Sequence, residues 1–183
     1  MPDVAPPAAR PAIPPLSLAL VNTLDEEAFV SAFSGVFEHS PWVARTAWRR
    51  RPFRGLADVH LAFEEAVRNA GDAAQLALIR AHPELAGRAA AEGEMTEEST
   101  REQASAGLNR LSPADLERLT ALNAAYGERF GFPMVICVRE HTVSSILAWA
   151  SHRLARSPED ELQTALLEIA KIAHLRLDDL VVG

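Results

Sequence analysis

The sequence predicts an all-α fold, a single-domain bundle of about seven to eight helices. Long segments repeat their apolar side chains every three or four residues, which is the spacing of one helix face. Serine–proline pairs or other good helix starts precede several of these segments, and glycine, asparagine or proline follows them. The one strand-like run, Met134 to Val138, is short, and the sequence offers no run of similar character to pair with it.

The composition suits one domain with a sizeable core, because 48% of the 183 residues are hydrophobic and 23% are charged. Residues 1–15 hold six of the twelve prolines and almost no large apolar side chains, so they cannot form a helix and would bury little surface. We therefore expect a proline-rich, disordered tail over residues 1–15 and an all-helical domain over residues 16–183.

Two helices are expected in the first part of the domain. One begins near Asp25, because Glu26 and Glu27 suit the first turn of a helix and apolar side chains share one face over residues 28–37. The other begins at Ser40, a good N-cap that is followed by proline at the first helical position.

The next two expected helices are separated by a glycine turn. An apolar stripe over residues 59–67 predicts a helix that the segment 69–71, with asparagine and glycine, closes. Asp72 can cap the following helix, which ends at His82 because Pro83 pushes the residue before it out of helical geometry. His82 is thus expected on a rigid turn at a helix end.

Three more helices are expected in the second half. The serine–proline pair at 112–113 opens one that Gly131 ends, and apolar spacing predicts another over residues 142–156. The serine–proline pair at 157–158 starts the last helix.

Charge and cysteine content exclude several classes of protein. The net charge of −7 argues against nucleic-acid or anionic-membrane partners, because such binders concentrate positive charge. No apolar run approaches the roughly 20 residues that cross a bilayer, and the first residues lack the pattern of a signal peptide. The single cysteine, Cys137, excludes an intrachain disulfide and favours a buried, inert thiol over a nucleophile. A cytoplasmic protein is expected.

Local metal and nucleotide motifs are absent from the sequence. None of the six histidines lies three or four residues from another, which is the spacing that puts two ligands on one helix face. A histidine metal site would need ligands from separate helices and is not expected. The sequence also lacks a glycine-rich phosphate loop and a Gly-x-Ser-x-Gly nucleophile motif.

Two polar constellations lie beside breaks in the helical pattern. His82, next to Pro83, can titrate near neutral pH, although a turn histidine would have the same sequence context. If a helix covers Ser99, Glu102 and Gln103, their side chains share one face. That face could hold a urea-like ligand or could simply be solvated.

A third constellation surrounds the helix break at Gly131. The backbone amides of Phe132 to Ile136 are not used by a helix, so they must find acceptors in the chain itself or in a ligand. Arg139 follows this segment and could pair with a carboxylate of a substrate or of the protein.

Taken together and in order, five blocks resemble the family of OHCU decarboxylases, which act on 2-oxo-4-hydroxy-4-carboxy-5-ureidoimidazoline (OHCU) in ureide-forming purine breakdown. The blocks are FEHSPWVA, HPELAGR, STREQASAGL, LNAAYGERFGFPMVICVR and EIAKIAHLRL. The resemblance runs from Leu18 to Leu180 and leaves the proline-rich start outside.

The resemblance implies an all-helical, homodimeric enzyme that takes a small ureide as its substrate and works without a metal or an organic cofactor. The catalytic residues it implies are His82 and Glu102. The substrate-binding residues it implies are Pro83, Ser99, Thr100, Arg101, Gln103, Phe132, Pro133, Met134, Val135, Ile136 and Arg139. An arginine at position 139 could equally be structural.

The implied substrate can lose CO2 without an added electron sink. Its carboxylate and hydroxyl share a ring carbon next to a C=N bond, so the electrons left behind delocalise into an enol, and protonation of one face gives (S)-allantoin. His82 is the expected acid/base group, a role typically worth about 10²–10⁴-fold in rate. Glu102 would orient His82 or hold the substrate, and Gln103 with the loop amides would fix the urea-like edges.

A rival interpretation is a non-catalytic helical interaction module associated with purine-degradation enzymes. In that case the polar blocks would serve as helix caps and turns. Binding of allantoin or a similar ureide would separate the two interpretations, because a module without a pocket should bind neither.

Overall fold

The computed structural model describes residues 15–93 and 95–182, and in this part of the chain the predicted all-α fold is confirmed. The tail predicted for residues 1–15 lies outside the described residues, apart from Pro15. The helices are α1 Leu18–Thr23, α2 Glu26–Ala32, α3 Pro41–Trp48, α4 Leu56–Arg68, α5 Asp72–Arg80, α6 Arg88–Glu92, α7 Glu97–Ser105, α8 Pro113–Phe130, α9 Val143–Arg153 and α10 Pro158–Leu180.

Most helices begin where the sequence predicts. The side chains of Asp25, Ser112 and Ser157 accept a hydrogen bond from the backbone amide three residues later and so cap α2, α8 and α10. Thr142 and Ser145 form a reciprocal capping box at the start of α9. The short helices α1 and α6 are additions to the predicted set.

Two segments differ from the pattern expected of them. α2 ends at Ala32, and residues 33–39 form turns instead of continuing the helix. Phe33 and Phe37 are nevertheless buried, because successive turns keep these side chains on the core side. The strand-like run 134–138 is a buried loop that leads into a short 3₁₀ helix, η2 Val138–Glu140.

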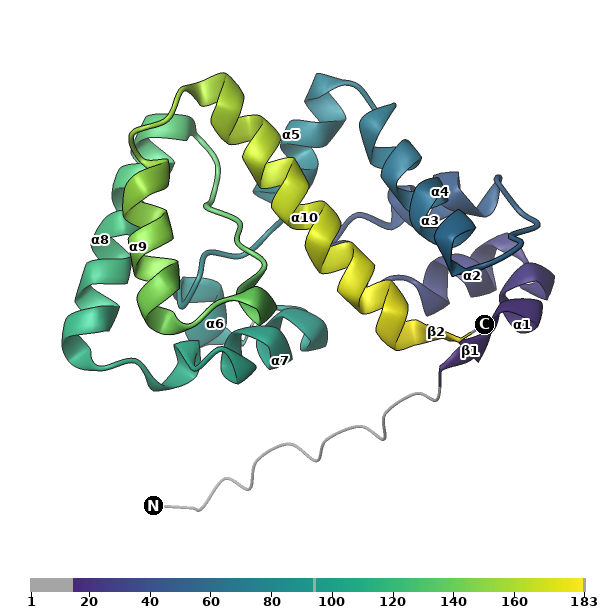
Figure 1. Cartoon of the computed structure of the whole chain (residues 1–183), viewed down its shortest axis with the longest axis horizontal. Helices are drawn as coiled ribbons and strands as arrows, with labels where there is room; N and C mark the ends of the chain where they lie inside the picture. Colours follow the sequence, from purple (N-terminus) through teal and green to yellow (C-terminus); the bar gives the residue numbers. More distant parts are fainter. Residues whose placement is uncertain (1–14, 94, 183) are drawn as a thin grey trace, which may run out of the picture.

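A two-residue parallel pairing joins the two ends of the domain. β1 Leu16–Ser17 lies beside β2 Val181–Val182, with Leu16 opposite Val181. This places the start of α1 beside the end of α10 (Figure 1). Two residues are too few to carry a strand period, so the sequence does not signal this pairing.

α10 is the central helix of the molecule. It runs diagonally across Figure 1, in yellow, with α2 to α5 on one side and α6 to α9 on the other. Glu161, Glu168 and Arg176 are buried on it together with its apolar residues. Because a buried charge needs a partner, these positions mark where other segments meet α10. Among the described residues, no helix is long and apolar enough to cross a membrane.

Candidate functional site

A small cavity lies where the end of α5, helix α7, the loop after α8 and helix α10 meet. Its volume is about 30 Å³, which is room for about one water molecule. The lining residues are His82, Pro83, Leu85, Ser99, Glu102, Gln103, Met134, Val135, Ile136, Val138, Ile172 and Arg176. Residues from all three predicted constellations therefore meet at one cavity.

His82 is held in one orientation just after α5. Its ring Nδ1 lies 2.9 Å from the carbonyl oxygen of Leu78. A carbonyl can only accept, so Nδ1 carries the proton and Nε2 is an acceptor in the neutral ring. Burial of the ring lowers the pKa of His82 from 6.5 to about 4. At neutral pH the cavity therefore contains a neutral imidazole of fixed tautomer.

Glu102 is paired with Arg176 of α10. Its carboxylate oxygens accept from Nε of Arg176 at 2.9 Å and from Nη2 at 2.6 Å, which is a bidentate geometry. The other N–H groups of Arg176 donate to the carbonyls of Gly35 and Val36 and to Oγ of Ser99. All five donors of the guanidinium are thus used within the protein. Arg176 fixes the position of Glu102 and keeps no free donor for a ligand.

Sequence reasoning missed Arg176 and named Arg139 instead. Arg139 pairs with Asp179 at 2.7 Å, at the surface, and does not line the cavity. The available signal was the position of Arg176 in the last helix, three residues after Ala173 and directly before Leu177, both of which are buried. A charged residue on an otherwise apolar helix face indicates a buried partner.

A fully buried carboxylate, Glu38, lies behind Ser99 in the turn between α2 and α3. Ser99 Oγ donates to it at 2.6 Å, and Thr96 donates through its backbone amide at 3.1 Å and its hydroxyl at 2.8 Å. Burial alone would raise the pKa of Glu38, but these hydrogen bonds and the charge of Arg176 hold it below its ordinary value. Sequence reasoning missed Glu38 as well, although it is part of the FEHSPWVA block.

Gln103 holds the turn that follows His82. Its Oε1 accepts from the backbone amide of Ala86 at 2.9 Å, and its Nε2 donates to Sδ of Met95 at 3.3 Å. Ala86 has a φ of 48°, a region that residues with a Cβ rarely adopt, so this hydrogen bond stabilises a strained turn. The amide of Gln103 is therefore engaged by the protein at the edge of the cavity.

The loop after α8 contributes the buried residues Met134, Val135 and Ile136 to the cavity wall. The loop is tied down from behind, since Arg153 donates to the carbonyl of Val135 and the amide of Cys137 donates to Glu168 at 2.8 Å. Within residues 15–93 and 95–182, the amides of residues 134–136 have no protein acceptor. Buried amides without an acceptor are rare, so this wall suits a ligand that carries acceptor oxygens.

Several predicted substrate-binding side chains do not line the cavity. They are Thr100, Arg101, Phe132, Pro133 and Arg139. Thr100 and Arg101 are exposed on α7, where Arg101 pairs with Glu98 at 3.4 Å. Phe132 is buried and packs edge-on against Tyr126 at 5.9 Å. The structure brings His82, Pro83, Ser99, Glu102, Gln103 and residues 134–136 together, and the others lie around them.

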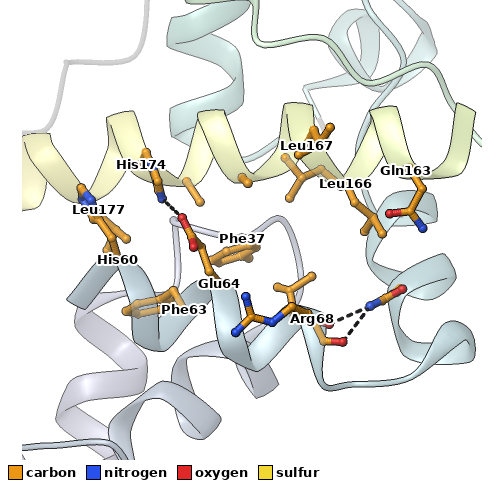
Figure 2. A pocket seen from close by; sticks show the side chains of 15 residues that line it. Phe37, His60, Phe63, Glu64, Arg68, Gln163, Leu166, Leu167, His174 and Leu177 are labelled. Atoms are coloured by element: carbon orange, nitrogen blue, oxygen red, sulfur yellow. Dashed lines mark hydrogen bonds and ion pairs between the residues drawn. The ribbon is translucent and has the colours of Figure 1, made fainter. Parts of the chain in front are cut away.

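A larger cavity, of about 290 Å³, lies between α10, α4 and α5 (Figure 2). Its walls are mostly apolar, and three of its polar side chains, His60, His174 and Glu64, contact one another. The rings of His60 and His174 stack at 4.3 Å, and Nε2 of His174 lies 2.5 Å from Glu64. This cavity is the larger candidate for a ligand site. The cavity beside His82 is the better candidate for catalysis, because residues of all three predicted constellations line it.

The described residues contain no cluster of three or more histidine, cysteine, aspartate or glutamate side chains placed to hold a metal ion. Cys137 is buried, and burial raises the pKa of its thiol to about 11. The thiol is therefore protonated at neutral pH, as expected of an inert buried cysteine.

Comparison with known proteins covers nearly the whole described domain. The model of the family described as OHCU decarboxylase matches residues 22–178. The OHCU decarboxylase of Halalkalicoccus jeotgali is 42% identical over 167 residues, and that of Mus musculus is 43% identical over 169 residues. Each alignment covers 91% of this chain and 93% of the relative. The crystal structure of an (S)-allantoin synthase is similar with a TM-score of 0.73 and 26% identity, covering 91% of this chain and 54% of that one, so the chain spans about half its length.

Proposed function

Because the chain belongs to the OHCU decarboxylase family, we propose that the cavity beside His82 is where it converts OHCU to (S)-allantoin. The protein is a carboxy-lyase that removes CO2 from OHCU and yields allantoin in urate degradation. One observation carries the assignment of the site. A neutral imidazole, a carboxylate anchored by arginine and three buried residues whose amides find no acceptor in the described part of the chain line one cavity.

The reaction balances within the substrate and water. The bond from C4 to the carboxylate breaks, and its electrons form a C4=C5 double bond while the C=N electrons move to nitrogen, which takes a proton. The C4 hydroxyl then loses its proton as C4=O forms, and C5 takes a proton. One proton is consumed and CO2 is released. The electron pair stays in the product, so no external oxidant or reductant enters the balance.

His82 is suited to the transfer of a proton from the C4 hydroxyl to C5. Its Nε2 is unprotonated at neutral pH, because Nδ1 is committed to Leu78 and the ring is neutral. It accepts the hydroxyl proton and returns it to one face of C5, which makes the product a single enantiomer. His82 is the catalytic residue of this proposal.

The surrounding groups hold the substrate and the developing charge. Glu102, kept in place by Arg176, accepts from the ureido N–H groups or the hydroxyl of the substrate. The amides of residues 134–136 donate to the substrate oxygens on which negative charge builds up. The present cavity is smaller than OHCU, so substrate binding requires the turn after His82 or this loop to shift outward.

A chiral assay on freshly made OHCU tests the site. OHCU also decays spontaneously to racemic allantoin, so the readout is the excess of (S)-allantoin together with the rate of CO2 release. His82→Asn should lose both, while its circular dichroism spectrum and melting temperature stay near wild type. His152→Asn is the control, because His152 is an exposed histidine on α9 that stacks on Trp149. If His82→Asn gives the same excess of (S)-allantoin as wild type, His82 is not the acid/base group of the reaction.

We further propose that the enzyme is a homodimer in the cytoplasm, as the resemblance implies. Light scattering on the purified protein should give twice the mass of one chain. The rival interaction-module interpretation predicts no binding of (S)-allantoin. Titration of wild type and His82→Asn with (S)-allantoin separates a ligand site from a surface without one.

A further inference from the structure

Glu38 is connected to the cavity by a continuous chain of hydrogen bonds. It is 1% exposed and accepts from Ser99 Oγ at 2.6 Å. Ser99 Oγ in turn accepts from Nη2 of Arg176 at 3.0 Å, and the same Nη2 donates to Glu102 at 2.6 Å. Glu102 lines the cavity, whereas Glu38 does not. Ser99 and Arg176 also line the cavity, and Nη1 of Arg176 lies 3.8 Å from Glu38, so this carboxylate lies directly behind the proposed site.

The direction of each hydrogen bond in this chain follows from the charges at its ends. A carboxylate only accepts and a guanidinium only donates, whereas a serine hydroxyl does both. The single proton of Ser99 therefore points to Glu38, and an oxygen lone pair of Ser99 faces Arg176. A neutral amide at position 38 could donate to Ser99 and turn its hydroxyl around, which would place the proton against Arg176.

Glu38 also fixes the start of α7, the helix that carries Glu102. Thr96 is the N-cap of α7, and both its backbone amide and its hydroxyl donate to Glu38. One carboxylate thus holds the helix by its cap and by its first turn. Movement of this helix end would displace Glu102 relative to His82.

We propose that Glu38 is a positioning residue of the decarboxylation site, which acts through Ser99 and Thr96 to hold Arg176 and Glu102 in their reactive arrangement. This inference rests on the proposed function. Glu38 touches neither the cavity nor the substrate, so it is not a catalytic residue.

Glu38 also contributes to the charge around His82. Its negative charge favours the protonated ring, while the positive charge of Arg176 and the nearby His39 oppose that form. Glu102, on the facing helix, lines the same cavity. Removal of the Glu38 charge should therefore lower the pH at which His82 titrates.

The first test compares Glu38→Gln with Glu64→Gln. Glu64 pairs with His174, and both line the larger cavity, so its substitution removes an equal charge outside the proposed site. Glu38→Gln should lower kcat about 10- to 100-fold, since small displacements in a site have effects of this size. The acid limb of kcat/KM should also move to lower pH. Glu64→Gln should stay within about twofold of wild type in kcat, with an unshifted acid limb.

A double-mutant cycle shows whether Glu38 acts through Ser99. Ser99→Ala should lower kcat, and Glu38→Gln combined with Ser99→Ala should be about as slow as the slower single variant. Additive losses would show that the two residues act independently and would overturn the proposal. All rates are measured well below the melting temperature of each variant, so that the folded fraction is complete.

Titration of the His82 ring by NMR, in the ligand-free protein, gives a readout that needs no turnover. A lower midpoint in Glu38→Gln, but not in Glu64→Gln, supports the link between Glu38 and His82. If wild type fails to accelerate OHCU decay while this shift is seen, the proposed function fails and the link stands. If wild type is active and Glu38→Gln matches Glu64→Gln in both rate and titration, the role of Glu38 is wrong.

Discussion

Arg153 and Arg176 are both buried arginines that are paired with glutamate, yet they serve different parts of the molecule. Arg153, on α9, is 0% exposed and donates to Glu161 at the start of α10 and to the carbonyl of Val135. Tyr126 completes the group, because its hydroxyl donates to Glu161 at 2.6 Å. These three side chains lie in the protein interior, and the partly exposed Arg156 lies 3.9 Å from the other carboxylate oxygen of Glu161.

The group around Arg176 has one open side. Its carboxylate partner Glu102 is 13% exposed and lines the cavity, whereas Glu161 is fully buried. The two arginine–glutamate pairs therefore have different roles. The pair enclosed by protein fixes a backbone segment, whereas the pair beside the cavity holds a carboxylate in a fixed orientation. The two groups also meet at one cavity, since Val135, whose carbonyl Arg153 binds, lines the same cavity as Glu102.

Arg153→Met should give the largest loss of stability. It leaves the buried Glu161 with only the long contact to Arg156, at 3.9 Å, and breaking a buried ion pair typically costs about 3–5 kcal/mol. Urea unfolding at pH 7 measures the change. Adding Glu161→Leu to this variant should recover much of the loss, because no buried carboxylate then remains without its close partner. If the unfolding free energy of Arg153→Met stays within about 1 kcal/mol of wild type, the pair does not contribute strongly to stability and the prediction is wrong.

Arg176→Met should instead act mainly on the reaction. We expect kcat/KM to fall about 10²–10³-fold, or about 3–4 kcal/mol of barrier, because Glu102 loses its orientation. The free energy of unfolding should fall less than in Arg153→Met, since water in the cavity can solvate Glu102. If Arg176→Met were as unstable as Arg153→Met but fully active when folded, the two pairs would be equivalent and the distinction would fail.

The pH dependence of stability should come partly from the group that contains His82. Its pKa of about 4 lies below the ordinary value of 6.5, so between these values the unfolded chain binds a proton that the folded protein does not. The resulting stability is complete above pH 6.5 and decreases as the pH falls towards 4, by about 3 kcal/mol. Urea unfolding at pH 7 and pH 4.5 should show a smaller decrease in His82→Asn than in wild type. Equal decreases would place the His82 pKa near its ordinary value.

The smallest expected effects come from two N-cap substitutions. Thr96→Ala and Thr142→Ala each remove the cap of one helix, α7 or α9, and should each cost about 1 kcal/mol of unfolding free energy. Thr96 also donates to Glu38, so Thr96→Ala alone should lower kcat/KM. Thr142→Ala is its control. A similar loss of activity in both variants would contradict the claim that the start of α7 positions the site.

Local signals account for most of the predicted fold. Ser112, Ser157 and their following prolines gave correct helix starts, because capping depends on neighbouring residues alone. The early end of α2 was not predicted, since the turns after Ala32 keep the apolar spacing of a helix. The pairing of β1 with β2 joins segments that are far apart in sequence, so no local sequence pattern predicts it.

The site was predictable in part for a similar reason. Its grouping of His82 with Glu102 and residues 134–136 came from ordered blocks that resemble a known family, and the structure brings them to one cavity. Arg176 and Glu38 were missed because each meets its partner across more than fifty residues of sequence. Contacts of this kind depend on how the helices pack together, and patterns of neighbouring residues in the sequence do not predict that packing.

α10 carries Glu161, the partner of Arg153, and Arg176, the partner of Glu102, fifteen residues apart on one rigid rod. That interval spans roughly 22 Å along the axis, and each added or deleted residue would rotate one end against the other by about 100°. The two ion pairs could then not form together. An insertion or deletion between these residues should therefore be tolerated less well than a substitution at an exposed position of the same interval, such as Leu167.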